Sequence, residues 1–249
     1  MNIMIITEED VFYVREFFKY FYQYAQTSKF TIKGITILEP FNKKSKIQLA
    51  QQMLDFYGFF YFLKMGFLYV FKLATNQTIK GLSRKYKIPI ISAKNINSDE
   101  YINKIKEQNI DLIVSIAAPV IFKKKLINSV PKGCINSHSA LLPENKGMMP
   151  VFWTMYKKEP YLGITIHYID EQLDNGDIII QEKIPNNFQS LHKAILFTKR
   201  KSAELMTEVL NNIAQGIIKR TPMPKGGSYQ SFPTKEDVKE FKRRGNKLF

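Results

Sequence analysis

The sequence predicts an α/β protein with a Rossmann-like, mostly parallel sheet flanked by helices, followed by a long helix and a short tail. Strand-like and helix-like segments alternate from residue 2 to residue 116. The strand-like runs are strongly apolar, as strands buried on both faces of a parallel sheet are. With 249 residues and 45% hydrophobic content, the chain can build one large core. We expect that core over residues 1–190, with residues 191–249 packing on it rather than forming a separate domain.

Each element follows from a local pattern. Short apolar runs predict strands at residues 2–7, 30–38, 88–92, 111–116, 161–168 and 176–183, and another that ends in Asn136-Ser-His138. Apolar residues at helical spacing predict helices at residues 8–25, 76–86, 98–108 and 190–216, and a short one that ends at Asn128. Ser98 is a suitable helix cap. The prolines and glycines of residues 219–249 predict an irregular tail.

Residues 53–71 form the most apolar stretch of the chain. A membrane span needs about 18 consecutive apolar residues, whereas Asp55 and Lys64 interrupt this stretch. We therefore expect a buried helix pair and no stable membrane insertion. The number of aromatic side chains exceeds what one core face needs, which leaves two alternatives open: a contact with a second subunit, or a contact with a membrane surface.

Composition narrows the functional classes. The formal charge of +15 comes mainly from lysine, and without an arginine-rich helix or an RNA-binding aromatic motif we expect solvated surface and no nucleic-acid partner. A single cysteine excludes a disulfide framework, so Cys134 is expected to be a buried hydrophobe. Residues 1–7 do not resemble a secretory signal, which predicts a cytoplasmic protein. No Gly-x-Gly-x-x-Gly motif or P-loop follows the first strand, so dinucleotide and NTP binding are unsupported.

Three polar side chains form a candidate site. Asn136 and His138 point the same way because side chains alternate along a strand, and they lie where that strand ends before a loop. A second strand leads through a polar loop to Asp174, whose carboxylate can return to the imidazole. An amide, a base and a carboxylate on two loops suit acyl transfer.

Other assignments fit less well. Ser137 and Ser139 lack the flanking glycines of a nucleophile elbow, and three scattered histidines with one cysteine do not match a zinc site. Among the histidines, His138 is the expected catalytic one, because His167 lies within a strand and His192 at the start of a helix. Two further aspartates, Asp170 and Asp177, compete with Asp174.

These motifs resemble those of a known family. Asn136-Ser-His138-Ser-Ala-Leu-Leu-Pro143, Gly163-Ile-Thr-Ile-His167 and Leu173-Asp-Asn-Gly176 are similar to the motifs of the folate-dependent formyltransferases. The similarity is dense from residue 111 to residue 184. It implies a catalytic trio of Asn136, His138 and Asp174, with 10-formyltetrahydrofolate as co-substrate and no metal.

The resemblance also suggests binding residues. On the folate side it implies Pro119, Val120, Phe122 and Asp170. On the acceptor side it implies Ser139, Asn145, Lys146, Pro150 and Trp153, although core packing is the favoured role of Trp153. Lys146 stands where many family members carry arginine. Glycinamide ribonucleotide transformylases usually carry a glycine- and serine-containing phosphate loop after the first strand, and its absence here counts against that substrate.

The amine that accepts the formyl group is the least determined point. Residues 227–241 are similar to the tails of bacterial enzymes that formylate nucleotide-linked amino sugars. We therefore expect a homodimeric sugar N-formyltransferase that acts on a dTDP- or UDP-linked amino-deoxy sugar. The favoured substrate is dTDP-4-amino-4,6-dideoxyglucose, and the expected role is in O-antigen synthesis. The alternative is a methionyl-tRNA formyltransferase-like enzyme without the tRNA-binding barrel, for which the chain leaves no room. Residues 195–249 keep it open, because 12 Lys and Arg against 5 Asp and Glu give +7.

Overall fold

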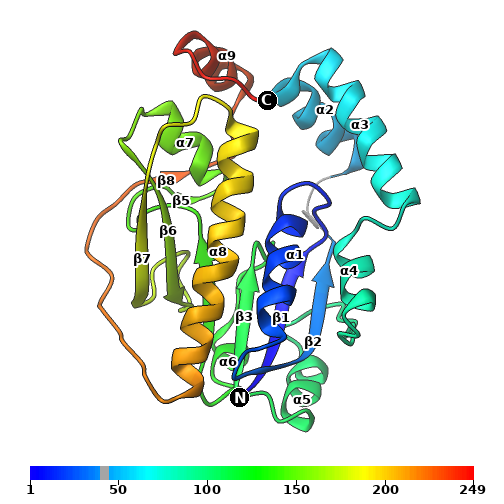
Figure 1. Cartoon of the computed structure of the whole chain (residues 1–249), viewed down its shortest axis with the longest axis vertical. Coiled ribbons are helices and arrows are strands. Elements are labelled where there is room, and N and C mark those ends of the chain that lie inside the picture. The colour runs from blue at the N-terminus through cyan, green and yellow to red at the C-terminus, as the bar shows by residue number, and fades with distance from the viewer. Residues whose placement is uncertain (40–44) are drawn as a thin grey trace.

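The computed structural model describes residues 1–39 and 45–249. Figure 1 shows the arrangement of its strands and helices. The strands are β1 (Asn2–Glu8), β2 (Thr31–Leu38), β3 (Leu112–Ile116), β4 (Cys134–His138), β5 (Lys146–Gly147), β6 (Tyr161–Tyr168), β7 (Ile178–Pro185) and β8 (Tyr229–Gln230). The helices are α1 (Val14–Ala25), α2 (Lys46–Tyr57), α3 (Phe59–Ala74), α4 (Ile79–Lys85), α5 (Asp99–Glu107), α6 (Lys124–Ile127), α7 (Pro150–Tyr156), α8 (Leu191–Ala214) and α9 (Lys235–Arg243).

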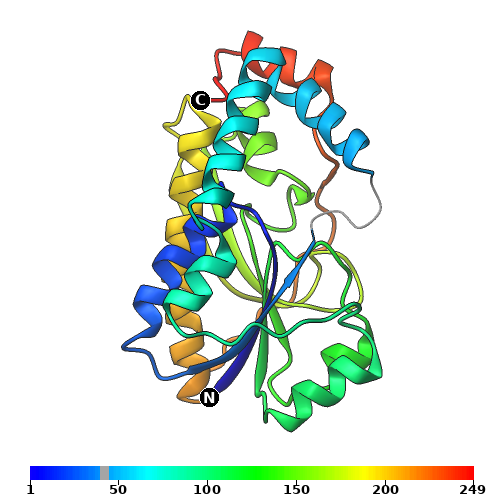
Figure 2. The same cartoon turned by 90° about the vertical axis from the view of Figure 1, so that its right-hand side faces the viewer.

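A six-stranded sheet forms the centre of the protein, in the order β2-β1-β3-β4-β6-β7. The first four strands pair in parallel, β6 runs antiparallel to β4, and β7 runs antiparallel to β6. Alternate side chains of β1 enter different cores: Ile5 packs with α1 and α8, and Ile6 with α5 and α6. Figure 2 shows these helix pairs on opposite faces of the sheet. The predicted α/β fold and its long helix, α8, are confirmed.

One predicted helix boundary and one predicted strand were wrong. The first helix begins at Val14 rather than at residue 8, because the Asp10 carboxylate accepts from the backbone N–H groups of Phe12 and Tyr13 and forms a turn there. The strand expected at residues 88–92 is reduced to a single bridge between Ile35 and Ile90. The predicted cap at Ser98 is present, since its side chain accepts from Tyr101 N–H.

The apolar stretch does form two helices, α2 and α3, but they are not buried as predicted. Of their described side chains, only Phe56 and Met65 are buried. The physical reason is that α3 is apolar around most of its circumference, while only one side of it packs on the chain. Within the described residues, no helix is both long enough and apolar enough to cross a bilayer.

Four short elements were not predicted. They are α7, α9 and the two-residue strands β5 and β8, which pair with each other. Helix α9 begins with a capping box between Thr234 and Asp237. Its Phe241 is fully buried and stacks on Phe152 of α7, with ring centroids 4.5 Å apart. The tail is thus anchored to the core at this point, while the division at residue 190 stays a prediction.

Candidate active site

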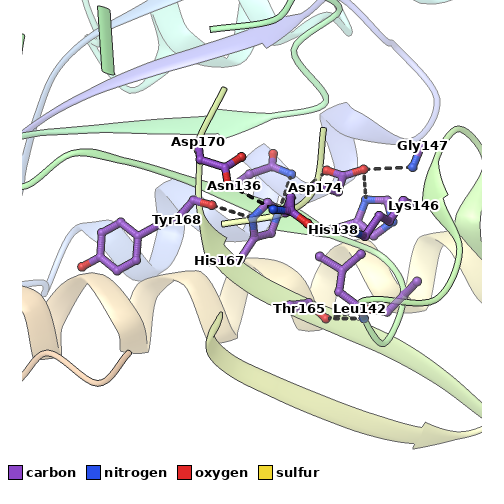
Figure 3. A network of polar contacts seen from close by, with 12 residues as sticks. Asn136, His138, Leu142, Lys146, Gly147, Thr165, His167, Tyr168, Asp170 and Asp174 are labelled. Carbon is purple, nitrogen blue, oxygen red and sulfur yellow. Dashed lines mark hydrogen bonds and ion pairs between the residues drawn. The ribbon is translucent and has the colours of Figure 1, made fainter. Parts of the chain in front are cut away.

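The end of β4 carries Asn136 and His138 on the same side of the sheet. The antiparallel register with β6 sets His167 directly opposite Asn136. Figure 3 shows these three side chains converging from two neighbouring strands. His138 and His167 are buried and Asn136 is half-buried. The paired strands therefore fix three polar groups at one place on the sheet.

Asp174 joins this group from the loop between β6 and β7. Its backbone adopts the left-handed region, with φ of 48°. Its Oδ2 lies 3.6 Å from His138 Nδ1 and its Oδ1 lies 3.7 Å from His167 Nε2. The N–H of Gly147 donates to the same carboxylate at 2.9 Å. A buried carboxylate needs such partners, and here it lies between two imidazoles, as Figure 3 shows.

The hydrogen-bond partner of His138 fixes its tautomer. Its Nε2 lies 2.8 Å from the Asn145 carbonyl oxygen, and a carbonyl oxygen only accepts, so Nε2 carries the hydrogen. In the neutral ring, Nδ1 then keeps its lone pair and faces the Asp174 carboxylate. This nitrogen can take a proton, and the resulting cation would lie between a carbonyl oxygen and a carboxylate. The arrangement suits a general base.

Burial favours the neutral form of His167. Burial lowers the pKa of its imidazole, although the nearby Asp174 carboxylate acts in the opposite direction. Its Nδ1 donates to the Tyr168 carbonyl oxygen at 2.7 Å, so Nε2 accepts from the Asn136 amide at 3.3 Å. That contact uses one amide hydrogen of Asn136 and leaves the second for a ligand. His167 was expected outside the trio because it lies within a strand, but the pairing of β6 with β4 places it opposite Asn136.

The predicted acceptor residues divide into two groups. Lys146 lies near the site and donates to the Asn175 side chain at 3.0 Å, and Pro150 begins α7. Ser139, the residue that follows His138, is buried. In contrast, two of the predicted side chains already have partners inside the protein.

Those two side chains are Asn145 and Trp153. The amide of Asn145 is fully buried, donates to Thr154 and Glu159, and accepts from Lys157. The Trp153 indole packs in the core and donates to the Ser231 carbonyl oxygen. Neither side chain has its polar atoms free for an acceptor, and for Trp153 this favours the packing role.

On the predicted folate side, Pro119 and Val120 are half-buried and Phe122 lies in the core. The Asp170 carboxylate holds its own loop, because it accepts from Gln172 N–H and from the Asn175 amide. This loop borders a cavity of about 830 Å³, which is lined by Gly133, Cys134, Tyr168, Asp170, Asn175 and Arg220, among others. Among the predicted folate residues, only Asp170 lines it. Among the described residues, no three His, Cys, Asp or Glu side chains are placed to hold a metal ion.

Comparison with known proteins finds similarity in sequence and in fold. A family model described as formyl transferase matches residues 69–202, which is just over half of the chain. The methionyl-tRNA formyltransferase of Kosmotoga olearia is 35% identical over 165 residues, which cover 64% of this chain and 52% of that protein. The chain thus spans about half the length of the curated relatives it matches.

Two solved structures show the same fold at low identity. A sugar N-formyltransferase from a Shewanella species is 20% identical, with a TM-score of 0.59 over 92% of this chain and 76% of that one. The phosphoribosylglycinamide formyltransferase of Anaplasma phagocytophilum is 17% identical, with a TM-score of 0.61 over 93% of this chain and 99% of that one. The names of these similar proteins include three different acceptors, so likeness of fold does not choose among them.

Proposed function

This chain belongs to the formyl transferase family, and on that premise we propose that it transfers a formyl group from 10-formyltetrahydrofolate to the amine of a nucleotide-linked amino-deoxy sugar. The observation that carries formyl transfer is the buried cluster in which the Asp174 carboxylate lies 3.6 Å from His138 and 3.7 Å from His167. Asn136 is tied to the same cluster through His167. Among the described residues this cluster combines an oxyanion donor with a base of fixed tautomer.

Each group has a part in the reaction. The acceptor nitrogen attacks the formyl carbon, and the carbon–N10 bond breaks as the tetrahedral intermediate collapses. The free amide hydrogen of Asn136 stabilises the oxyanion, which for one well-placed donor is worth roughly 2.7–4 kcal/mol. His138 Nδ1 takes the proton that the amine loses and returns it to the departing N10, while Asp174 stabilises the imidazolium between these steps. Protons balance, and no group on the protein is consumed.

The tail supports an amino-sugar acceptor. Its β8 strand pairs with β5, and Ser228 accepts from Asn145 N–H at 3.0 Å. The segment whose sequence resembles the tails of nucleotide-sugar enzymes therefore packs beside Lys146, whose ammonium group can contact a diphosphate. We take dTDP-4-amino-4,6-dideoxyglucose as the first choice, with its UDP-linked and 3-amino counterparts next. The product would serve surface polysaccharide synthesis, in the cytoplasm.

The loop after β1 argues against a phosphoribosyl acceptor. Where a phosphate loop would lie, the chain carries Glu8, Glu9 and Asp10. The Glu9 carboxylate accepts from the N–H groups of Ile79 and Lys80 and so occupies the start of α4. Carboxylates at this position repel a phosphate monoester.

Methionyl-tRNA is the second candidate acceptor. The curated relatives that align with the chain carry that name. The surplus of seven positive charges in residues 195–249 also suits phosphate contacts along an RNA. The two candidates differ in the identity of the formylated molecule, which a mass measurement reads directly.

The test incubates the purified protein with 10-formyltetrahydrofolate and a panel of acceptors. The panel holds dTDP- and UDP-linked 3-amino and 4-amino deoxy sugars, and methionyl-tRNA. We expect one formyl group to be gained by a nucleotide sugar. Gain on the tRNA and on no sugar would assign the second candidate, and gain on none would refute formyl transfer to these acceptors.

The matched variants use two histidines of the same chain. His138→Ala should slow transfer by about 10²–10⁴, the usual contribution of a general base. His192→Ala removes an imidazole that lies outside the cluster, beside Tyr13, and should leave the rate close to that of the unmodified protein. Equal losses in both variants would contradict the assignment of His138.

A further inference from the structure

Helix α3 presents a row of large apolar side chains to solvent. We call it the α3 stripe, and it consists of Phe59, Phe60, Leu63, Phe67, Val70 and Phe71. All six are exposed, Phe60 by 83% and Phe67 by 72%. Met65, on the opposite side of the helix, is buried against the chain. In Figure 1, α3 runs along the outer edge of the molecule, away from the central sheet.

The size of the stripe is that of an interface. Taking about 200 Å² for a fully exposed phenylalanine side chain, its four phenylalanines alone leave on the order of 500 Å² of apolar surface in water. Monomeric proteins rarely expose contiguous patches larger than a few hundred Å². A stable dimer buries about 800 Å² per partner. The stripe could therefore supply much of the surface that each copy buries in a dimer.

The spacing of the stripe fits a second helix. Phe60, Leu63, Phe67 and Val70 are separated by three, four and three residues, which is the spacing of seams between paired helices. Between them lies Gly66, and a Cβ added there would meet nothing within 4 Å in the described residues. Glycine inside a helix costs about 1 kcal/mol relative to alanine. No packing contact among the described residues requires a glycine here, whereas the close approach of a helix from a second molecule would require one.

Charge argues against a lipid surface as the occupant. Residues 45–78 contain Lys46, Asp55, Lys64 and Lys72 as their charged side chains, so they hold two of the fifteen surplus positive charges. Helices that bind anionic membranes carry many lysines or arginines beside the apolar face. Residues 45–78 are therefore poor in the cations that such a contact needs.

We propose that two copies of this chain pair through the α3 stripe, with the two helices antiparallel about a two-fold axis near Gly66. The middle of α3 falls between Gly66 and Phe67. In this arrangement Leu63 faces Val70 of the second copy, and each Phe67 packs beside the glycine of the other helix. The inference does not depend on which amine accepts the formyl group, and its test uses no catalytic readout.

The first experiment measures association by sedimentation velocity over a wide range of protein concentration. The unmodified protein should dimerise, and Phe67→Asp should raise the dissociation constant at least thirtyfold, as the loss of a central apolar contact does. The matched control is Ile217→Asp, because Ile217 is 60% exposed but lies after α8. A protein that is monomeric at the highest concentration, or a dimer that Phe67→Asp leaves intact, would overturn the proposal.

A second pair of variants separates a helix partner from a membrane. Gly66→Leu enlarges the apolar surface at a position where an added Cβ meets no described atom within 4 Å. It should weaken the dimer by blocking close approach, whereas it would strengthen flotation with phosphatidylglycerol vesicles if lipid were the occupant. Stronger flotation together with unchanged dimerisation would show that the stripe contacts a membrane, and it would refute the proposed dimer interface.

Cross-linking tests the orientation. Gly66→Cys should form a disulfide-linked dimer on oxidation, because the two residues lie near the axis. Phe60→Cys should not, since antiparallel helices rising 1.5 Å per residue set the two positions roughly 20 Å apart, beyond disulfide reach. The natural cysteine does not compete, because Cys134 is buried and burial raises the pKa of its thiol. Rapid linkage of Phe60→Cys instead would exclude the antiparallel pairing.

Discussion

At the scale of single residues, Asn145 connects the packing of the protein to its candidate chemistry. Its backbone lies in the left-handed region, with φ of 55°, which asparagine tolerates better than most residues. Its carbonyl oxygen accepts from His138 Nε2, and its buried amide is held by Thr154, Glu159 and Lys157. The core contacts of one side chain therefore fix which ring nitrogen of His138 carries the hydrogen.

Replacing Asn145 with alanine should loosen this control. Without the amide contacts the carbonyl is no longer held in place, so we expect His138 to become a mixture of tautomers. Transfer should slow by about tenfold, which is less than the 10²–10⁴ expected for losing the base. NMR of ¹⁵N-labelled imidazoles, of which the chain has three, reports the tautomer without any substrate.

The control is Asn211→Ala, because Asn211 accepts from Lys29 N–H on the far side of the protein. It should leave the His138 signals unchanged. An Asn145→Ala protein whose His138 signals match those of the unmodified chain would show that the carbonyl is held by other contacts.

At the scale of elements, burial decides what the sequence could predict. Strands such as β3, with every residue buried, and the long helix α8 carry strong local patterns. Helix α9 does not: between Lys235 and Arg243 only Val238 and Phe241 are apolar, which reads as solvated chain. The two-residue strands β5 and β8 lie about 80 residues apart in sequence, and no local signal reports such a pairing.

The candidate site divides in the same way. Asn136, His138 and Asp174 belong to compact motifs, so the sequence alone brought them together. His167 also belongs to one of these motifs, but it was not assigned to the trio, because its place opposite Asn136 follows only from the antiparallel register of β6 against β4. The prediction that the aromatic stretch is buried was wrong for a related reason. Hydrophobicity indicates that a surface is favoured in a contact, but it does not indicate whether the contact is with the same chain or with another molecule.

Helix α9 offers a test of how firmly the tail is anchored. Phe241 is fully buried and stacks on Phe152, so Phe241→Ala should lower the free energy of unfolding by about 3–5 kcal/mol. Thr234→Ala removes the helix cap and should cost about 1 kcal/mol. Urea denaturation measures both. A Phe241→Ala effect no larger than that of Thr234→Ala would mean that α9 contributes little to the core.

At the scale of the whole molecule, burial and charge act together on Glu8, a partly buried carboxyl at the end of β1. Burial raises the pKa of the Glu8 carboxyl from about 4.5 to about 7, the nearby Asp10 acts in the same direction, and Lys199 opposes them. Burial also lowers the pKa of the Lys199 amine. Desolvation therefore outweighs the attraction between these two groups.

This imbalance predicts how stability changes with pH. Because the folded state raises the pKa of Glu8, it binds this proton more tightly than the unfolded chain does. The resulting stabilisation is complete below pH 4.5 and is lost as the pH rises through about 7. A shift of this size corresponds to at most about 3–4 kcal/mol. Glu8→Gln keeps a neutral group at every pH, so its stability relative to the unmodified protein should increase between pH 5 and pH 8.

Urea denaturation of both proteins at a series of pH values measures this difference. Glu208→Gln is the matched control, because it removes an exposed carboxylate from α8, the helix that carries Lys199. A Glu8→Gln advantage that stays constant from pH 5 to pH 8 would show that Glu8 is ionised in the folded protein throughout, paired with Lys199. In that case attraction to Lys199 rather than desolvation would decide the charge of Glu8 at neutral pH.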